Sequence, residues 1–181
     1  MIDVKNLRKS YQTQDKIVEI LKGINIHVNP GDFMIIMGES GSGKTTFLNC
    51  VSGFDTIDEG SIEIGGTKLN EIKGKALEQL RLHQFGFIFQ DNYLIDNLTI
   101  LENVAMQYDA KAYEKAIELL KKVHIDHLKD NYPSQVSGGE KQRCAIARAL
   151  VNEPKILFAD EPTAALDRQT ADEIMNILSE L

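Results

Sequence analysis

Eight consecutive residues near the start of the chain combine glycines with a lysine and a threonine. They read Gly38-Glu39-Ser40-Gly41-Ser42-Gly43-Lys44-Thr45 and fit the pattern G-x-x-x-x-G-K-[ST]. The glycines permit backbone angles that turn successive N–H groups inward around phosphate oxygens, and a helix beginning near Gly43 adds the positive end of its dipole. Lys44 is then placed to reach the β- and γ-phosphates and the Thr45 hydroxyl to bind Mg²⁺. The sequence therefore predicts a binding site for a nucleoside triphosphate.

Two acidic residues, Asp160 and Glu161, follow the apolar run Ile156-Leu157-Phe158-Ala159. In open α/β sheets, ligands bind beyond the carboxyl ends of the strands, and a carboxylate there can hold Mg²⁺. The next residue, Glu161, could polarise a water molecule aimed at the γ-phosphate, which is the work of a general base. An acidic pair after a strand is often only the end of the strand. The phosphate loop in the same chain favours the catalytic interpretation.

A third segment, Ser137-Gly138-Gly139-Glu140, precedes a predicted helix. The Ser137 hydroxyl and the N–H groups of the glycines would form a second anion site at the start of that helix. Taken alone, the segment is better explained as a simple turn that begins a helix. Two anion sites in one small domain raise a question, because one chain cannot easily direct both at the same phosphate.

The elements that would hold these residues follow from the apolar pattern. The first thirty residues alternate apolar and polar side chains, which predicts half-buried strands up to a turn at Asn29-Pro30-Gly31. The continuous apolar run from Phe33 to Met37 predicts a buried parallel strand that leads into the glycine-rich loop. A helix is expected over 45–52, with Gly53 at its C-terminal end.

The remaining elements alternate strands with helices around the same loop. We expect short strands at 61–64, 85–89 and 156–159, helical segments from Thr99 to about Val123 and from about Gly139 to Val151, and a last helix from about Arg168 to Leu181. This order predicts a parallel α/β core with a helical insertion at approximately 91–135.

Composition limits the possible partners and compartment. The 181 residues carry 20 Lys and Arg against 27 Asp and Glu, and the formal charge of −7 argues against nucleic acid as a partner. No apolar run reaches the length of a spanning helix, and the N-terminus lacks the layout of a secretory signal. Cys50 and Cys144 have no metal-ligand spacing. We expect a cytoplasmic chain whose membrane association comes through a partner.

The segment Val136-Ser137-Gly138-Gly139-Glu140 resembles the LSGGQ signature of the ATP-binding-cassette (ABC) ATPases, with Val for Leu and Glu for Gln. The resemblance runs nearly end to end. It implies an α/β fold, a P-loop NTPase (RecA-like) core with an N-terminal antiparallel β subdomain and an inserted helical subdomain. It also implies that residues 1–181 form a single ATP-binding domain, truncated at its C-terminus.

The resemblance assigns further residues to the site. Tyr11 lies where the family stacks an aromatic ring on adenine, although without the resemblance it is an ordinary strand aromatic. Gln90 matches the Q-loop glutamine, which contacts Mg²⁺ and links the site to the transmembrane partner. Ala164-Ala165-Leu166-Asp167 matches the D-loop. With Glu161 as the catalytic base, the expected Mg²⁺ ligands are Thr45, Gln90 and Asp160. The expected nucleotide-binding residues are Tyr11, Gly38, Glu39, Ser40, Gly41, Ser42, Gly43, Lys44, Thr45, Thr46, Gln90, Ser137, Gly138, Gly139, Glu140 and Asp167.

The resemblance also implies an assembly. On binding ATP the family forms head-to-tail dimers, homomeric or heteromeric, in which the phosphate loop of one subunit faces the Ser137 segment of the other. Such a dimer would give each anion site a different role at the same nucleotide. A transmembrane permease would hold the chain on the cytoplasmic face of the membrane. The segment Phe89-Gln90-Asp91, with Glu102-Asn103-Val104, resembles the branch of lipoprotein-release, macrolide-export and antimicrobial-peptide-resistance ATPases.

Several alternatives bear on this interpretation. The chain lacks the D-x-x-G and N-K-x-D segments of small GTPases and the G-x-G-x-x-G turn of dinucleotide-binding domains. In the family a switch histidine follows the D-loop helix, but all four histidines, His27, His83, His124 and His127, precede Asp160. We therefore expect an ATPase subunit of a transporter, with activity impaired by the missing histidine. The alternatives are an ATP-binding module without hydrolysis and a cytosolic, non-transport ABC ATPase.

Overall fold

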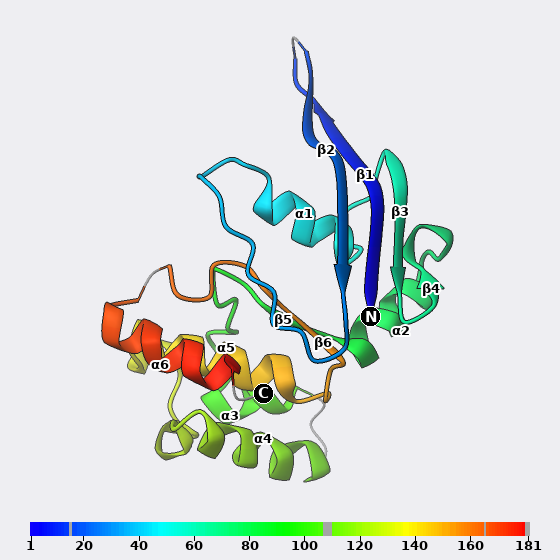
Figure 1. Ribbon diagram of the computed structural model, residues 1–181. Helices are drawn as coiled ribbons and strands as arrows, with labels where there is room; N and C mark the ends of the chain where they lie inside the picture. The colour runs from blue at the N-terminus through cyan, green and yellow to red at the C-terminus, as the bar shows by residue number, and fades with distance from the viewer. Residues whose placement is uncertain (15, 107–109, 165, 180–181) are drawn as a thin grey trace. The chain divides into compact units, whose positions relative to one another are not determined.

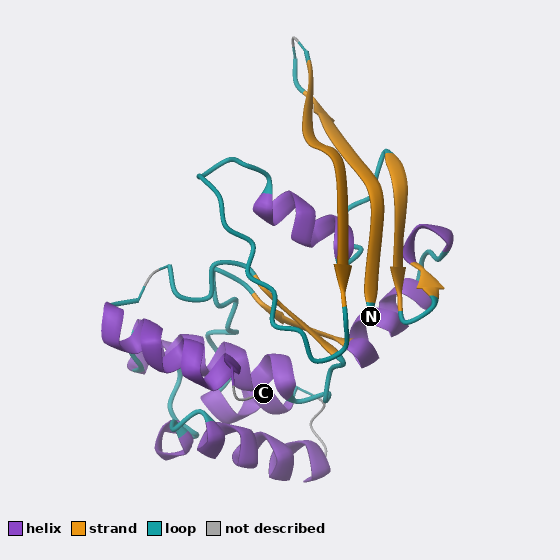
Figure 2. Ribbon diagram, viewed as in Figure 1, coloured by secondary structure: helices purple, strands orange, loops and turns teal. Residues whose placement is uncertain are grey.

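The computed structural model describes residues 1–14, 16–106, 110–164 and 166–179, in two compact units, Met1–Arg81 and Leu82–Leu181. Figure 1 labels the elements of each unit, and Figure 2 distinguishes helices from strands. Ala165 of the predicted D-loop and Leu181 of the predicted last helix lie outside the described residues. No helix within the described residues is long and apolar enough to cross a membrane.

The first unit is built on an antiparallel sheet of order β2-β1-β3-β4. The central strand, β1 (Ile2–Gln12), pairs with β2 (Ile17–Val28) and with β3 (Glu59–Ile64), and β4 (Thr67–Lys68) pairs with β3. Alternate apolar residues of these strands, including Val4 and Ile62, are fully buried. The alternation in the sequence therefore predicted these half-buried strands correctly.

Three helical segments complete this unit. The helix α1 (Lys44–Val51) buries Phe47, Cys50 and Val51, and Gly53 at φ 72° follows its end, as expected. A short 3₁₀ helix, η1 (Leu69–Glu71), and the helix α2 (Lys75–Gln84) follow the sheet, and the residues of α2 up to Arg81 belong to this unit.

The run from Phe33 to Met37 differs from the prediction. It has no regular secondary structure, and its five apolar side chains are 37% to 87% exposed. A strand needs a neighbour to satisfy its N–H and C=O groups, and neither sheet within the described residues includes this run. The prediction of a buried parallel strand here was wrong for this reason.

The second unit contains a parallel pair of strands and a helical core. The strands β5 (Phe85–Ile88) and β6 (Ile156–Ala159) pair in register, with Ile88 opposite Ala159. Between and after them lie α3 (Ile100–Ala105), α4 (Ala110–Lys122), η2 (Asp126–Leu128), η3 (Pro133–Gln135), α5 (Gly138–Leu150) and α6 (Arg168–Ser179).

These helices share one hydrophobic core. It includes Ile100, Val104, Leu120, Ile146 and Ile174, all without exposed surface. The predicted helical segment over 99–123 consists of two helices, because α3 ends at Met106, whose φ is 26°. The mixed α/β class, with an antiparallel sheet and a parallel pair, agrees with the prediction.

Candidate nucleotide and catalytic sites

The phosphate loop takes its shape from its glycines. Gly41 and Gly43 have φ values of 78° and 98°, a region that L side chains rarely adopt. A Cβ at Gly38 would lie 2.7 Å from the Ser42 Oγ, so a larger residue would not fit without displacing Ser42. The Ser42 N–H donates to the Glu39 carbonyl at 3.2 Å, which closes the turn. The loop is therefore an exposed and tightly curved backbone segment.

Lys44 points back into this loop from the first residue of α1. Its Nζ donates to the carbonyl oxygens of Gly38 at 2.9 Å and Glu39 at 3.0 Å. The N-cap residue Gly43 provides no side-chain acceptor for the first turn of the helix, and Thr45 there is exposed. A lysine ammonium, a curved backbone and a helix N-terminus together form a cradle for a polyanion.

Tyr11 lies near the end of β1 and is 40% exposed. Its hydroxyl donates to Asp55 Oδ2 at 2.7 Å, and the Lys9 ammonium lies 5.1 Å from its ring centroid. The hydrogen bond to Asp55 raises the pKa of Tyr11 above its ordinary value, and burial adds to the shift. Sequence reasoning missed Lys9 and Asp55. The available signal was that Lys9 shares a strand face with Tyr11, because residues two apart on a strand point the same way.

Gln90 and Asp160 lie just beyond the carboxyl ends of the parallel strands β5 and β6. Ile88 ends β5 opposite Ala159, and the Asp160 N–H donates to the Ile88 carbonyl at 2.9 Å. Glu161 is exposed and has a φ of 46°, a conformation that costs a non-glycine residue free energy and is often found at functional sites. The amide and carboxylate oxygens at these strand ends are ligands that Mg²⁺ prefers, so these residues fit such an ion.

The Ser137 segment caps α5. The Ser137 Oγ accepts from the Glu140 N–H at 3.4 Å, and Glu140 Oε2 accepts from the N–H and the hydroxyl of Ser137 at 2.7 and 2.8 Å. These hydrogen bonds lower the pKa of Glu140. The capping box presents the N–H groups of Gly138 and Gly139 at the beginning of the helix.

The predicted D-loop contacts this segment through Thr170. Asp167 accepts hydrogen bonds from the Thr170 N–H at 3.1 Å and the Thr170 hydroxyl at 2.7 Å, which lower its pKa. A Cβ at Gly139 would lie 2.8 Å from Thr170 Cγ2. Thr170 therefore joins the Ser137 segment to Asp167, and sequence reasoning did not identify it.

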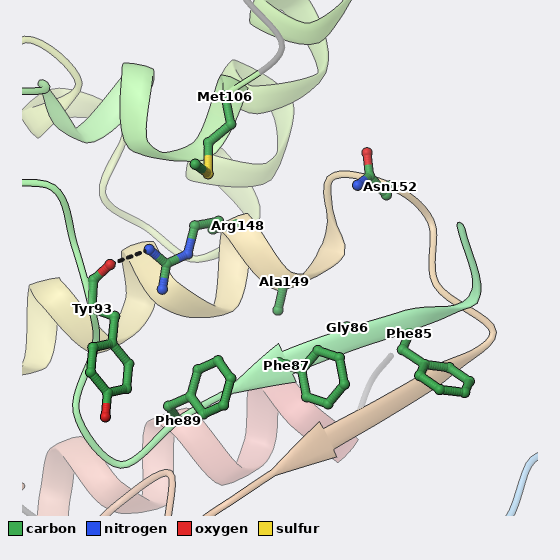
Figure 3. A pocket seen from close by; sticks show the side chains of 9 residues that line it. All are labelled: Phe85, Gly86, Phe87, Phe89, Tyr93, Met106, Arg148, Ala149 and Asn152. Carbon is green, nitrogen blue, oxygen red and sulfur yellow. Dashed lines mark hydrogen bonds between the residues drawn. The ribbon is translucent and has the colours of Figure 1, made fainter. Parts of the chain in front are cut away.

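A pocket of about 320 Å³ lies beside β5 (Figure 3). Arg148 donates to the Tyr93 carbonyl at 2.7 Å and also to the Asn92 carbonyl. These bonds attach α5 to the segment that follows Gln90. The pocket is lined by Phe85, Gly86, Phe87, Phe89, Tyr93, Met106, Arg148, Ala149 and Asn152. It combines aromatic surface with one guanidinium.

The predicted residues thus form a set within each unit. The first unit holds Tyr11 and the loop residues 38–46, and the second holds Gln90, the segment 137–140, Asp160, Glu161 and Asp167. Within the described residues, no three His, Cys, Asp or Glu side chains form a cluster that could hold a metal ion by themselves. The phosphate cradle around Lys44 and the acidic pair Asp160 and Glu161 after β6 define a nucleotide-binding protein of the P-loop class.

Comparison with known proteins gives the family. The sequence profile described as ABC transporter matches residues 21–164. The whole chain is 43% identical to the bacitracin export ATP-binding protein BceA of Halalkalibacterium halodurans and covers 74% of that protein. It is 42% identical to the macrolide export ATP-binding/permease protein MacB of Mannheimia succiniciproducens, but spans only 29% of its length. The chain therefore belongs to the ABC transporter family, as an ATPase domain.

Solved structures support the same conclusion. The ATP-binding cassette MJ0796, in a dimeric post-hydrolysis state bound to ADP and Pi, is 39% identical and matches 98% of this chain and 81% of its own, with a TM-score of 0.90. A second dimeric structure of this bacterial ABC transporter cassette gives 40% identity, the same coverages and a TM-score of 0.90. These comparisons confirm the predicted family and fold class.

Proposed function

We propose that the chain binds ATP with Mg²⁺ and hydrolyses it as the ATPase subunit of a membrane transporter that exports its substrate. The observation that carries the proposal is the phosphate cradle of the first unit, with Lys44 directed into the loop. Asp160 and Glu161, which follow β6 in the second unit, supply the groups that hydrolysis requires. Export as the direction of transport is supported by the similarity to the bacitracin export and macrolide export proteins.

Binding uses residues of the first unit at both ends of the nucleotide. The exposed Tyr11 ring stacks on adenine, and the N–H groups of the loop hold the phosphates. Lys44 exchanges its two carbonyl acceptors for phosphate oxygens. Thr45, Gln90 and Asp160 would hold Mg²⁺, and the bound ion would neutralise phosphate charge.

Hydrolysis uses Glu161. Its carboxylate accepts a proton from the water that attacks the γ-phosphate, and the oxygen of that water forms the new bond to phosphorus as the bond to ADP breaks. The left-handed backbone of Glu161 turns the chain sharply after β6.

Two copies of the cassette share each nucleotide. In a head-to-tail dimer, homomeric or heteromeric, the segment 137–140 of one copy faces the phosphate loop of the other. The N-terminus of α5 supports this role, because an anion is stabilised there, and the Ser137 hydroxyl would exchange its bond to the Glu140 carboxylate for one to phosphate. The dimeric state of the MJ0796 structures supports the assembly.

A permease would contact the second unit. The aromatic pocket beside β5 lies where Phe89 and Tyr93 flank the segment containing Gln90 (Figure 3). A permease segment in this pocket would reach that segment directly. We assign the residues at approximately 91–135 to a helical subdomain for this contact, which places the chain on the cytoplasmic face of the membrane.

Steady-state release of phosphate tests the proposal. We expect the chain to release phosphate from ATP at a rate well above that of the Glu161→Gln variant, measured in parallel at saturating ATP. ATP binding without turnover above that control would instead support the alternative, a binding module without hydrolysis. Failure to bind ATP would contradict the phosphate site itself.

A further inference from the structure

Asp55 is attached rigidly to the C-terminal end of α1. The N–H groups of Phe54 and Asp55 both donate to the Asn49 carbonyl, at 2.8 and 3.0 Å, and the Ser52 hydroxyl donates to the Leu48 carbonyl at 2.7 Å. The same helix begins at Lys44, next to the phosphate loop. The position of Asp55 is therefore fixed relative to the residues that hold the phosphates.

The Asp55 carboxylate joins three groups. Its Oδ1 accepts from the Lys9 ammonium at 2.9 Å and from the Thr56 N–H at 2.7 Å, and its Oδ2 accepts from the Tyr11 hydroxyl at 2.7 Å. Lys9 is only 6% exposed and also donates to the Thr56 carbonyl at 2.7 Å. Charge-assisted hydrogen bonds such as these are shorter and stronger than neutral ones.

Electrostatics keep this carboxylate charged. Burial alone would raise the pKa of Asp55, but the hydrogen bonds from Tyr11, Lys9 and Thr56 outweigh it and lower the pKa below its usual value. Burial likewise opposes the charged form of Lys9, and the bond and charge of Asp55 overcome it and raise the pKa of Lys9. At neutral pH the pair is therefore ionic and accepts the Tyr11 hydroxyl as a donor.

We propose that Asp55, paired with Lys9, is a positioning residue that holds the Tyr11 ring at a fixed distance and tilt from the phosphate loop. An exposed tyrosine without this bond would rotate, and ordering its ring on binding would cost conformational entropy. Asp55 removes that cost in advance and links the adenine-stacking ring to the helix that follows the phosphate loop. The inference rests on the proposed stacking of Tyr11 on adenine and deepens it, because it assigns the specificity for the base to a residue that does not touch the nucleotide.

The geometry separates this role from simple scaffolding. Lys9 and the Thr56 N–H satisfy Asp55 Oδ1, while Oδ2 faces the Tyr11 hydroxyl. Removing only that hydroxyl therefore leaves the buried ion pair and the turn intact. Tyr11→Phe breaks the proposed link, together with the hydrogen bond between the same hydroxyl and the Thr46 side chain, and preserves the aromatic face.

The test compares ATP with inorganic tripolyphosphate, both with Mg²⁺, by isothermal titration of the chain. The ratio of the two affinities measures the contribution of the adenosine moiety, which contains the base. In Tyr11→Phe we expect this ratio to fall about three- to tenfold, with tripolyphosphate affinity unchanged. Asp55→Ala should lower the ratio equally, and the double variant no further than either single one. Asp58→Ala is the matched control, because Asp58 accepts only the Ser10 N–H among the bonds found in this turn.

The outcomes separate this proposal from the one on which it rests. If Tyr11→Phe keeps the ratio while Tyr11→Ala loses it, stacking stands and positioning by Asp55 is overturned. If Tyr11→Ala also keeps the ratio, the stacking role of Tyr11 fails and the positioning role with it. An equal loss of affinity for both ligands in Asp55→Ala and Tyr11→Phe would show a scaffolding role and overturn the proposal. Tyr11→Phe keeps the test decisive even if Asp55→Ala does not fold.

Discussion

The two units hold their functional residues by different means. In Met1–Arg81 the phosphate loop is exposed, and its shape depends on glycine backbone angles and on the bonds of Lys44 to loop carbonyls. In Leu82–Leu181 side chains fix the backbone instead, as Glu140 does at Ser137 and Arg148 at Tyr93. A loop held by its own backbone can exchange those bonds for a ligand. A segment fixed by side chains instead moves together with the helix to which it is attached.

This difference suggests a division of labour. Changes in the first unit should act on nucleotide affinity, because the cradle and Tyr11 lie there. Changes in the second unit should act on turnover or on folding, because its residues are a candidate base and the caps of packed helices. Each of the following variants tests one side of the comparison.

The largest effect is expected from Glu161→Gln in the second unit. Removing a general base costs about 10²- to 10⁴-fold in rate, so phosphate release at saturating ATP should fall within that range. Glu153→Gln is a matched control, because Glu153 is also a glutamate of this unit with positive φ, 50°, and its exposed carboxylate pairs with Lys115 at the surface. A similar loss in both variants would remove the catalytic role from Glu161.

Core packing of the second unit gives the next largest effect. Ile146 on α5 has no exposed surface, so Ile146→Ala should lower the free energy of unfolding by about 3 kcal/mol through lost burial and a residual cavity. Ile17→Ala, at an exposed position of β2, should change it by less than about 0.5 kcal/mol. Urea titration followed by circular dichroism measures both. Equal effects would contradict the assignment of the helical core.

The cap of α5 contributes less. Ser137→Ala removes the side-chain acceptor for the Glu140 N–H and should lower the free energy of unfolding by about 1 kcal/mol. The exposed Ser134 provides the control, since Ser134→Ala should leave stability within about 0.5 kcal/mol of the parent chain. The shift of the urea unfolding midpoint in each variant, at an unchanged slope of the free energy of unfolding against urea concentration, measures the two effects.

The smallest effect is the pH dependence of that cap. Hydrogen bonds from Ser137 lower the pKa of Glu140 from its usual 4.5, so their stabilisation is present above that value and is lost as the pH falls through the lowered pKa. The stability difference between the parent chain and Ser137→Ala should therefore narrow between about pH 6 and pH 3. A difference independent of pH would show that the bond from the Ser137 hydroxyl to the Glu140 carboxylate contributes nothing to the cap, since Ser137→Ala keeps the backbone bond.

Local patterns predicted most of the helices and strands and the turn of the phosphate loop. The glycines around Lys44 determine their own turn, and the alternation in the first thirty residues predicts β1 and β2, because these features depend on near neighbours. The run at 33–37 was mispredicted because strand formation depends on a partner that local sequence does not specify.

Distant contacts could not be predicted. The Tyr11–Asp55 bond spans 44 residues and the Arg148–Tyr93 bond spans 55, and both arise from tertiary packing. The approach of Gly139 to Thr170 likewise depends on how α5 and α6 pack. Asp55, Thr170 and Arg148 therefore emerged only from the structure. The roles assigned to the site residues remain predictions.

Titration of ATP into Lys44→Ala and Glu161→Gln side by side tests the division of labour most directly. Lys44→Ala should weaken ATP binding about 100-fold. The variant lacks the charge-assisted bonds from the lysine ammonium to phosphate, which are worth about 3 kcal/mol. Glu161→Gln should bind ATP within about twofold of the parent chain, since the base acts in the reaction rather than in binding. Unchanged affinity in Lys44→Ala, or an equal loss in both variants, would contradict the account.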